Sequence, residues 1–180
     1  MTHNASAEQK LAFWRMDDAK RQTLAEVGRV LEADLPGILD RFYDHLREWP
    51  EMRGMFEGEE GMRRARNRQL DHWRQLLSGR FDDTFFESVR KVGEIHQRLG
   101  LEPTWYMGGY AFVLGEMCAA IAHRFGDGWT RSNAQKRADA QRAVVQAALL
   151  DMDLAISVYH EEQANAKDRV IGEIAEQFDH

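Results

Sequence analysis

The sequence has little cysteine, little proline and no excess of positive charge, and each shortage excludes a class of protein. Cys118 is its one cysteine, so an internal disulfide, a C-x-x-C-H attachment motif and a thiolate zinc site are all excluded. Lys and Arg number 24 against 30 Asp and Glu, which gives a net charge of −6 and no basic field for a nucleic-acid backbone. We expect a protein of a reducing, cytoplasmic compartment that binds no nucleic acid.

The sequence also lacks long apolar runs and a secretory signal. Residues 1–10 do not place a basic segment before an apolar stretch, and we find no run of the length that crosses a membrane. The remaining composition, 43% hydrophobic and 30% charged over 180 residues, is typical of one soluble globular domain. We therefore expect a soluble chain with no membrane partner.

The spacing of the apolar residues predicts an all-α fold. Between the three prolines, apolar residues recur every three or four positions, and no segment shows the period-two alternation of a strand. Ser78-Gly79 and Gly100 are expected to end two helices, and Asp82 or Asp83 to cap the helix between them. Four stripes are predicted to face the core: Leu24, Val27 and Leu31; Leu35, Leu39, Tyr43 and Leu46; Met62, Ala65, Gln69, His72 and Leu76; and Phe85, Val89, Val92, His96 and Leu99.

The last third of the chain predicts a long helix that begins at about Ser132 and follows a helix from Pro103 to about His123. It contains no proline and no glycine before Gly172, and its apolar residues occupy more than one face. One face can therefore pack on its own domain and another on a partner.

The end of this helix has a different character. The stretch 160–169 has no large apolar anchor, but Val170, Ile174 and Phe178 then begin a new stripe. A helix of that composition would be marginal alone in water, so we expect it to continue into a further module. The expected organisation is a domain over residues 1–160, a helical linker over 161–180 and an output domain beyond it.

The familiar enzyme and metal motifs are not found. None of the seven histidines follows a glutamate by three residues, which removes the E-x-x-H pair of di-iron bundles. The sequence also has no H-E-x-x-H, no G-x-x-x-x-G-K-[ST], no G-x-S-x-G and no EF-hand loop. The sequence therefore lacks the motifs that zinc hydrolases and nucleotide-binding proteins ordinarily use.

Two histidines lie on predicted apolar faces. His96 points toward the core, where an unpaired imidazole would carry a desolvation cost. It is either a ligand of a bound group or a core histidine bonded to a backbone carbonyl. Gly93, one turn earlier, favours the first interpretation because a missing side chain leaves room for a flat ligand. His72, beside Trp73, is interpreted as a satisfied interior histidine.

Tyr43 is a further candidate because a leucine would serve there if packing were the only demand. Its hydroxyl needs a partner, either on a neighbouring helix or in a ligand. The arginines at positions 63, 64, 66 and 68 form a local basic cluster. We interpret them as a solvated helix face, although one of them could pair with carboxylates at the mouth of a pocket.

The segment HQRLGLEPTWYMGG, from His96 to Gly109, resembles the proximal region of the sensor globins, the haem domains of globin-coupled sensors. Phe42-Tyr43, His72-Trp73 and the turn SGRFD at 78–82 agree with the same family in order and spacing. The resemblance covers about residues 10–165. It implies a globin fold with an extra N-terminal helix, over about Glu8–Met16, a long C-terminal helix, and a homodimer built on the last two long helices.

The resemblance also implies roles for individual residues. His96 would be the protein ligand of the iron of haem b, Tyr43 the distal residue that hydrogen-bonds O2, and Tyr106 a proximal-side residue that relays the ligand state. Ala65 stands where members of the family often have leucine, so the distal pocket would be roomier or more polar. The implied haem contacts are Phe42, Tyr43, Ala65, Gln69, Val92, His96 and Tyr106, with a contribution from either Arg68 or Gln69 left open.

The function implied by the resemblance is gas sensing. The domain would bind O2 reversibly, and also CO and NO, and would signal through a helical dimer to a C-terminal module such as a chemotaxis-type transducer. On this interpretation the domain is a ligand-binding sensor and no enzyme. Two alternatives stay open: a globin that binds or scavenges O2 or NO, and a haem-free helical dimerisation module in which His96 and Tyr43 are core residues.

Overall fold

The computed structural model describes residues 6–125 and 131–178, and in the last helix it describes the side chains of 132–161 and of Ile171. All the regular structure in this part of the chain is α-helical, which confirms the predicted all-α class. The helices are α1 (Ala7–Phe13), α2 (Asp18–Leu31), α3 (Leu35–Arg47), α4 (Pro50–Arg53), α5 (Gly58–Leu77), α6 (Asp83–Arg98), α7 (Pro103–Arg124) and α8 (Arg131–Phe178).

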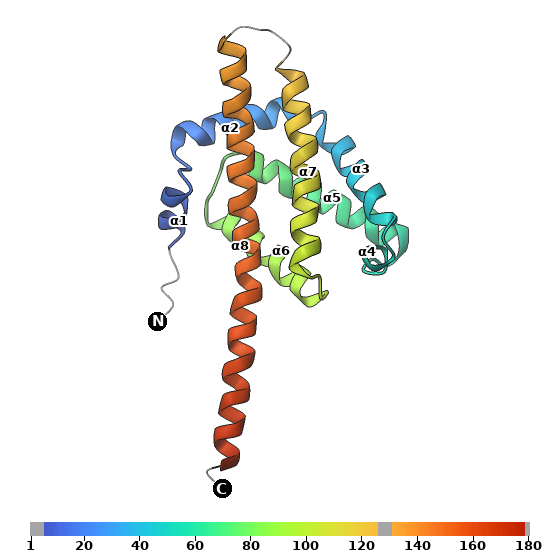
Figure 1. Ribbon diagram of the computed structural model, residues 1–180, viewed down its shortest axis with the longest axis vertical. Coiled ribbons are helices and arrows are strands. Elements are labelled where there is room, and N and C mark those ends of the chain that lie inside the picture. The colour runs from blue at the N-terminus through green and yellow to red at the C-terminus, as the bar shows by residue number, and fades with distance from the viewer. Residues whose placement is uncertain (1–5, 126–130, 179–180) are drawn as a thin grey trace.

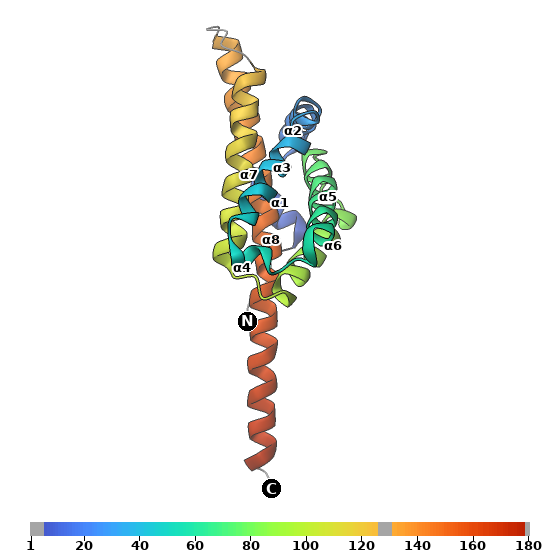
Figure 2. The ribbon, with the colours of Figure 1, turned by 90° about the vertical axis from the view of Figure 1, so that its right-hand side faces the viewer.

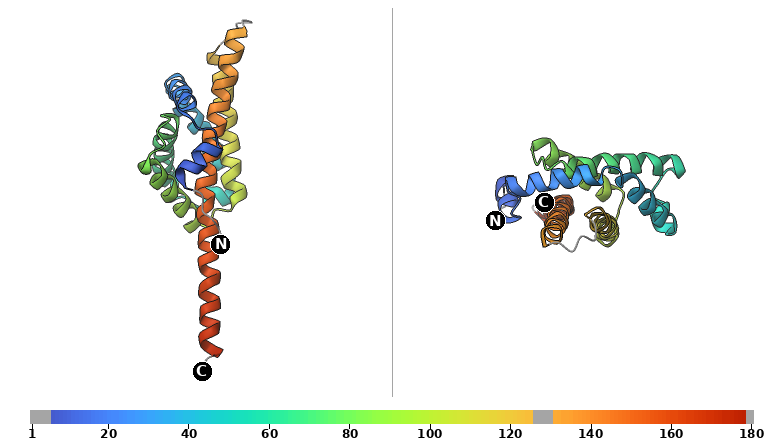
Figure 3. Two further views of the ribbon diagram at one scale, coloured as in Figure 1. Left: turned by 90° about the vertical axis from the view of Figure 1, so that its left-hand side faces the viewer. Right: turned by 90° about the horizontal axis from the view of Figure 1, so that it is seen from above.

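The helices form two layers (Figures 1 and 2). Helices α7 and α8 run side by side along the long axis, and α2, α3, α5 and α6 cross them on one side only. Helix α8 packs on α6, α7, α2 and α5 and then continues well past the rest of the domain. The view from above in Figure 3 shows that no other described helix lies on the opposite side of the α7–α8 pair.

Local signals explain where several helices begin and end. Ser6 and Gln9 form a reciprocal capping box, so α1 begins at Ala7 and ends at Phe13, earlier than the sequence predicted. At the start of α6 the Asp82 carboxylate accepts the backbone N–H of Phe85 at 3.0 Å. Gly79 has a φ of +71°, and a Cβ there would lie 2.4 Å from the carbonyl oxygen of Arg21. Only glycine fits that turn.

The predicted stripes form the core with one exception. The three stripe residues of α2 are buried. The first residue of each other stripe is buried as well: Leu35 on α3, Met62 on α5 and Phe85 on α6. Leu99 was predicted to continue the α6 stripe, but it is 52% exposed. The prediction is wrong there because α6 ends at Arg98 and the chain turns at Gly100, so Leu99 lies beyond the face that packs on α8. The stripe expected at Val170, Ile174 and Phe178 lies outside the described side chains.

The segment Ser132–Glu161 of α8 is long and apolar enough to cross a membrane by length and composition, contrary to our expectation from the sequence. Its central part is nonetheless a core element of the domain. It packs on α6, α7 and α2, and it carries the fully buried Asp151. Much of its apolar character is therefore explained by packing within the protein.

Candidate functional site

The site is built around His96 on α6. The helix is anchored by the buried side chains of Phe85 and Val89, and the half-buried imidazole of His96 lies two to three turns further on. Its Nδ1 is 2.8 Å from the carbonyl oxygen of Val92, so Nδ1–H donates to that oxygen. Burial lowers the pKa of His96 below its ordinary value, which keeps the imidazole neutral. The lone pair of Nε2, which bonds to no other described residue, is left for a ligand.

Tyr106, on α7, lies directly beside His96. The two ring centroids are 5.1 Å apart, and the rings meet edge to face at 62°. Tyr106 is buried, and burial raises the pKa of its hydroxyl, which therefore keeps its proton. The contact fixes one face of the imidazole against α7.

Tyr43 occupies a separate aromatic environment on α3. Its side chain is only 6% exposed and lies against the rings of Phe42 and Phe56, at 5.6 and 6.0 Å between centroids. Burial raises the pKa of Tyr43, with a smaller opposing effect from the charge of Arg66, so the hydroxyl stays protonated. This hydroxyl donates to none of the described residues, so its proton is available to a ligand.

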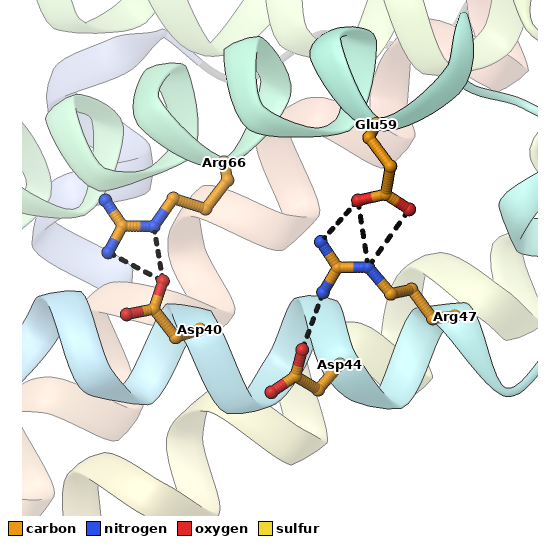
Figure 4. A network of polar contacts seen from close by, with 5 residues as sticks. All are labelled: Asp40, Asp44, Arg47, Glu59 and Arg66. Carbon is orange, nitrogen blue, oxygen red and sulfur yellow. Dashed lines mark hydrogen bonds and ion pairs between the residues drawn. The ribbon is translucent and has the colours of Figure 1, made fainter.

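Helix α5 lies close to Tyr43 and is clamped to α3 by ion pairs (Figure 4). The Arg66 guanidinium contacts Asp40 at 2.9 Å, and Arg47 reaches both Glu59 at 2.9 Å and Asp44 at 2.6 Å. The two clusters lie about two turns apart along α3, so they hold α5 at a set position relative to Tyr43. Exposed pairs of this kind contribute little to stability individually, because water and salt screen them.

The remaining α5 candidates differ in their surroundings. Ala65 and Gln69 are half-buried, and the Gln69 Oε1 atom is buried without a hydrogen-bond partner among the described residues. Arg68 is exposed and is the one arginine of the basic cluster that forms no ion pair within the described part of the chain. The other three are paired as Arg63–Glu60, Arg64–Glu57 and Arg66–Asp40.

Gly93 does not leave room for a ligand, and that part of the sequence interpretation is wrong. A Cβ at this position would lie 2.5 Å from the carbonyl oxygen of Ala155 and 3.0 Å from a methyl group of Val158. The missing side chain instead lets α6 approach the backbone of α8 closely. Gly93 therefore fixes the position of α6, and of His96 with it, relative to the long helix.

Phe42 and Val92 take supporting positions. Phe42 packs on α7, where a Cβ at Gly109 would meet its ring at 3.1 Å and the Phe112 ring lies 5.6 Å away. The half-buried Val92 provides the carbonyl that orients His96.

His72 belongs to a buried polar array that the sequence did not reveal. Its Nε2 is 2.8 Å from Oδ2 of Asp151, and the hydroxyl of Tyr110 donates to the same oxygen at 2.5 Å. The hydroxyls of Tyr106 and Tyr110 are 3.1 Å apart, which joins the array to the ring beside His96. A signal for Asp151 did exist, because it shares a helical face with Ala148 and Ala155, both buried.

The donor set fits a haem. A metal-ligating histidine ordinarily donates its second ring N–H to a carbonyl or carboxylate, as His96 does to Val92. Helices α5 and α6, which carry Gln69 and His96, are not among the pairs that pack closely on each other. No cluster of three or more His, Cys, Asp or Glu in the described part of the chain could hold a metal by itself. One neutral imidazole is the protein ligand that a haem iron requires.

Comparison with known proteins places the chain in a family. Residues 3–165 match the family model described as Protoglobin. A curated relative, the "Heme-based aerotactic transducer HemAT" of Halobacterium salinarum, is 28% identical over 114 residues. That match covers 63% of this chain and 23% of the relative, so the chain spans about a quarter of the relative's length.

Two solved structures share the fold. The globin domain of a Geobacter sulfurreducens globin-coupled sensor superposes with a TM-score of 0.75 at 20% identity, covering 84% of this chain and 96% of that one. The ferric globin domain of E. coli DosC gives a TM-score of 0.66 at 16% identity, covering 82% and 97%. The chain therefore has the globin fold seen in these sensor domains, which confirms the fold predicted from the sequence. It belongs to the Protoglobin family.

Proposed function

We propose that this domain is a haem-based gas sensor that binds O2 reversibly at a haem b held by His96. The proposal rests on the neutral His96 imidazole, whose Nδ1–H is bonded to Val92 and whose Nε2 bonds to no other described residue. When bound, the haem would supply an iron that takes a diatomic gas: O2, CO or NO. Tyr106 would hold the imidazole plane from one side. The work of the domain is ligand binding, not catalysis.

Tyr43 is proposed to select O2. O2 bound to haem carries partial negative charge and gains from a hydroxyl donor, whereas CO gains little. The Tyr43 side chain is largely buried, and its protonated hydroxyl bonds to no described residue, so it can be such a donor. Gln69 and Arg68 are the other polar groups proposed for this pocket, and Ala65 would leave space between them.

Tyr43→Phe should speed O2 release several-fold to about tenfold and leave CO release nearly unchanged, because a hydrogen bond contributes on the order of 1 kcal/mol net. Stopped-flow measurement of both release rates is the test. Thr84→Val, which removes an exposed hydroxyl in the first turn of α6, is the control. An unchanged O2 release rate in Tyr43→Phe would assign Tyr43 to packing and point to Gln69 or Arg68 as the donor.

The sensor is proposed to act as a homodimer through the uncovered face of α7 and α8. Along α7, Met107 is 44% exposed, and a Cβ at either Gly108 or Gly115 would meet nothing within 4 Å. Ala111 lies between these glycines and is also exposed. Small residues on an apolar helix allow a second helix to approach closely, and two copies of this face would form a two-fold four-helix contact.

Gly115→Arg should therefore convert a dimer into a monomer. A guanidinium at the centre of a close helix contact has no room and no partner. Light scattering coupled to size-exclusion chromatography at micromolar concentration measures the change. Glu87→Arg adds the same side chain on α6, in the other layer, and should leave the dimer intact. A wild-type monomer, or a dimer that survives Gly115→Arg, would remove this face from the proposal.

The signal is proposed to leave the domain along α8. A globin domain over residues 1–160 and a helical linker over 161–180 would connect the haem to a C-terminal output module in a cytoplasmic protein. The HemAT relative is an aerotactic transducer by name, and a chemotaxis-type output is the one we propose here. Coupling requires that the state of the haem shifts an element which the output also contacts, and α8 contacts α6 and continues beyond the domain.

A further inference from the structure

Asp151 is fully buried, although charged side chains are almost never fully buried unless they are paired. Within the described residues it is the charged side chain with no exposed surface, and it sits in the middle of α8 between Leu150 and Met152. Burying a carboxylate is costly unless it is paired and hydrogen-bonded. Asp151 is paired through Oδ2 alone, which contacts His72 of α5 and Tyr110 of α7 and so joins three helices at one oxygen atom. Its Oδ1 is buried without a partner among the described residues.

The charge of Asp151 also sets the direction of every hydrogen bond in the array. An ionised carboxylate only accepts, so Tyr110 must donate to it. Because the Tyr110 hydroxyl hydrogen already bonds to Asp151, the Tyr106 hydroxyl must donate the hydrogen bond to the Tyr110 oxygen, at 3.1 Å. Each hydroxyl therefore has one orientation, and the hydrogen bond of its hydroxyl fixes the Tyr106 ring.

The Tyr106 ring itself contacts the His96 imidazole, with ring centroids 5.1 Å apart. A chain of direct contacts thus runs from the imidazole through Tyr106 and Tyr110 to Asp151. It begins on α6, crosses α7 and ends on α8, the helix that extends out of the domain. The close approach of α6 to α8 at Gly93 places the two ends of this chain on helices that pack directly on each other.

We propose that Asp151 is a positioning residue for the proximal side of the site. It fixes Tyr110 and Tyr106, sets the orientation of His96 through them, and so couples the His96 side of the pocket to α8. This inference rests on the proposed function, because it assigns a task to the same His96. A purely structural ion pair with His72 is the competing account, and it predicts no effect of Asp151 on His96.

Asp151→Asn tests the proposal because it keeps the shape of the side chain and removes its charge. An amide can donate as well as accept, so Tyr110 and Tyr106 lose their single orientation. Tyr110→Phe breaks the same chain with the carboxylate and His72 left in place. Asp153→Asn, an exposed carboxylate two residues further along α8, is the matched control. Circular dichroism of each variant checks that the fold is kept.

The first readout uses haem-loaded protein. Asp151→Asn and Tyr110→Phe should both change the release of O2 and of CO by at least about twofold and shift the iron–histidine stretching band. A proximal effect acts on both gases, whereas loss of the distal Tyr43 donor acts on O2 alone. The control should match the wild type. Wild-type values in both variants would overturn the proposal and leave the haem assignment intact.

The second readout uses haem-free protein and separates the two proposals. The Tyr106 ring lies edge to face with His96, so its ring current sets the NMR shifts of the His96 ring protons. Asp151→Asn and Tyr110→Phe should move these signals, and Asp153→Asn should not. Unmoved signals in both variants would contradict the positioning role. If the wild type binds no haem, the proposed function fails, and these shifts still decide the role of Asp151.

Discussion

His96→Ala should abolish the retention of haem or move the iron to a different ligand. His96 has a neutral imidazole whose Nε2 bonds to no other described residue, and alanine has no atom that could bind the iron in its place. The expected result is loss of the Soret band from protein purified after haem loading. His72→Gln is the control, because Nε2 of His72 is already bonded to Asp151 and glutamine keeps an N–H donor there. Its Soret band should stay close to that of the wild type.

Two other outcomes would change the assignment. Equal loss of haem from both variants would show that the proximal side has been misplaced. Retention in His96→Ala together with loss in His72→Gln would make His72 the ligand. Free imidazole added to His96→Ala should restore part of the Soret band if the site is intact and lacks only its ligand.

His72→Leu should destabilise the fold by about 3–5 kcal/mol, the typical cost of leaving one partner of a buried ion pair alone. Asp151 would keep only the hydrogen bond from Tyr110 and would lose the opposite charge on α5. Urea unfolding followed by circular dichroism measures the change in the free energy of unfolding. The double variant His72→Leu, Asp151→Asn should recover part of the loss, because no buried charge is left unpaired. No recovery would mean that the pair contributes through shape alone.

The same pair predicts a pH dependence. Burial by itself would lower the pKa of His72, but the charge and hydrogen bond of Asp151 outweigh it and raise the pKa above 6.5. A group whose pKa is raised on folding contributes its full stability below its unfolded pKa and loses it as pH rises through the folded value. The wild type should therefore lose stability as pH rises above 6.5, and His72→Leu should lose less. Equal slopes of unfolding free energy against pH would contradict the pair.

Local sequence signals were sufficient for most of the fold. Helix periodicity does not depend on distant contacts, so the helices and their buried stripes could be predicted from spacing alone. Glycines with positive φ at positions 79 and 100, and the Asp82 cap, act within a few residues of the chain. Leu99 was predicted to be buried and is exposed. Periodicity alone does not show where a helix stops packing on its neighbour.

The parts of the site that depend on distant residues were harder to predict. His72 and Asp151 are 79 residues apart, so no local spacing predicts their contact. The apolar neighbours of Asp151 along the chain also give no sign that it has a buried partner. Gly93 shows the same difficulty: a missing side chain can admit a ligand or another helix, and only the position of Ala155 on α8 decides between them. The roles of His96, Tyr43 and Tyr106 came from the family resemblance and remain proposals.

Optical titration of the purified wild-type protein with haem tests whether His96 holds a gas-binding haem. We expect a Soret band that grows to an endpoint of one haem per chain and shifts when the reduced sample is exposed to CO, because one histidine would hold the haem and leave a position open for the gas. A titration with no endpoint, or a Soret band that does not respond to CO, would contradict a gas-binding haem at His96. The first of these results would make the domain a haem-free helical module.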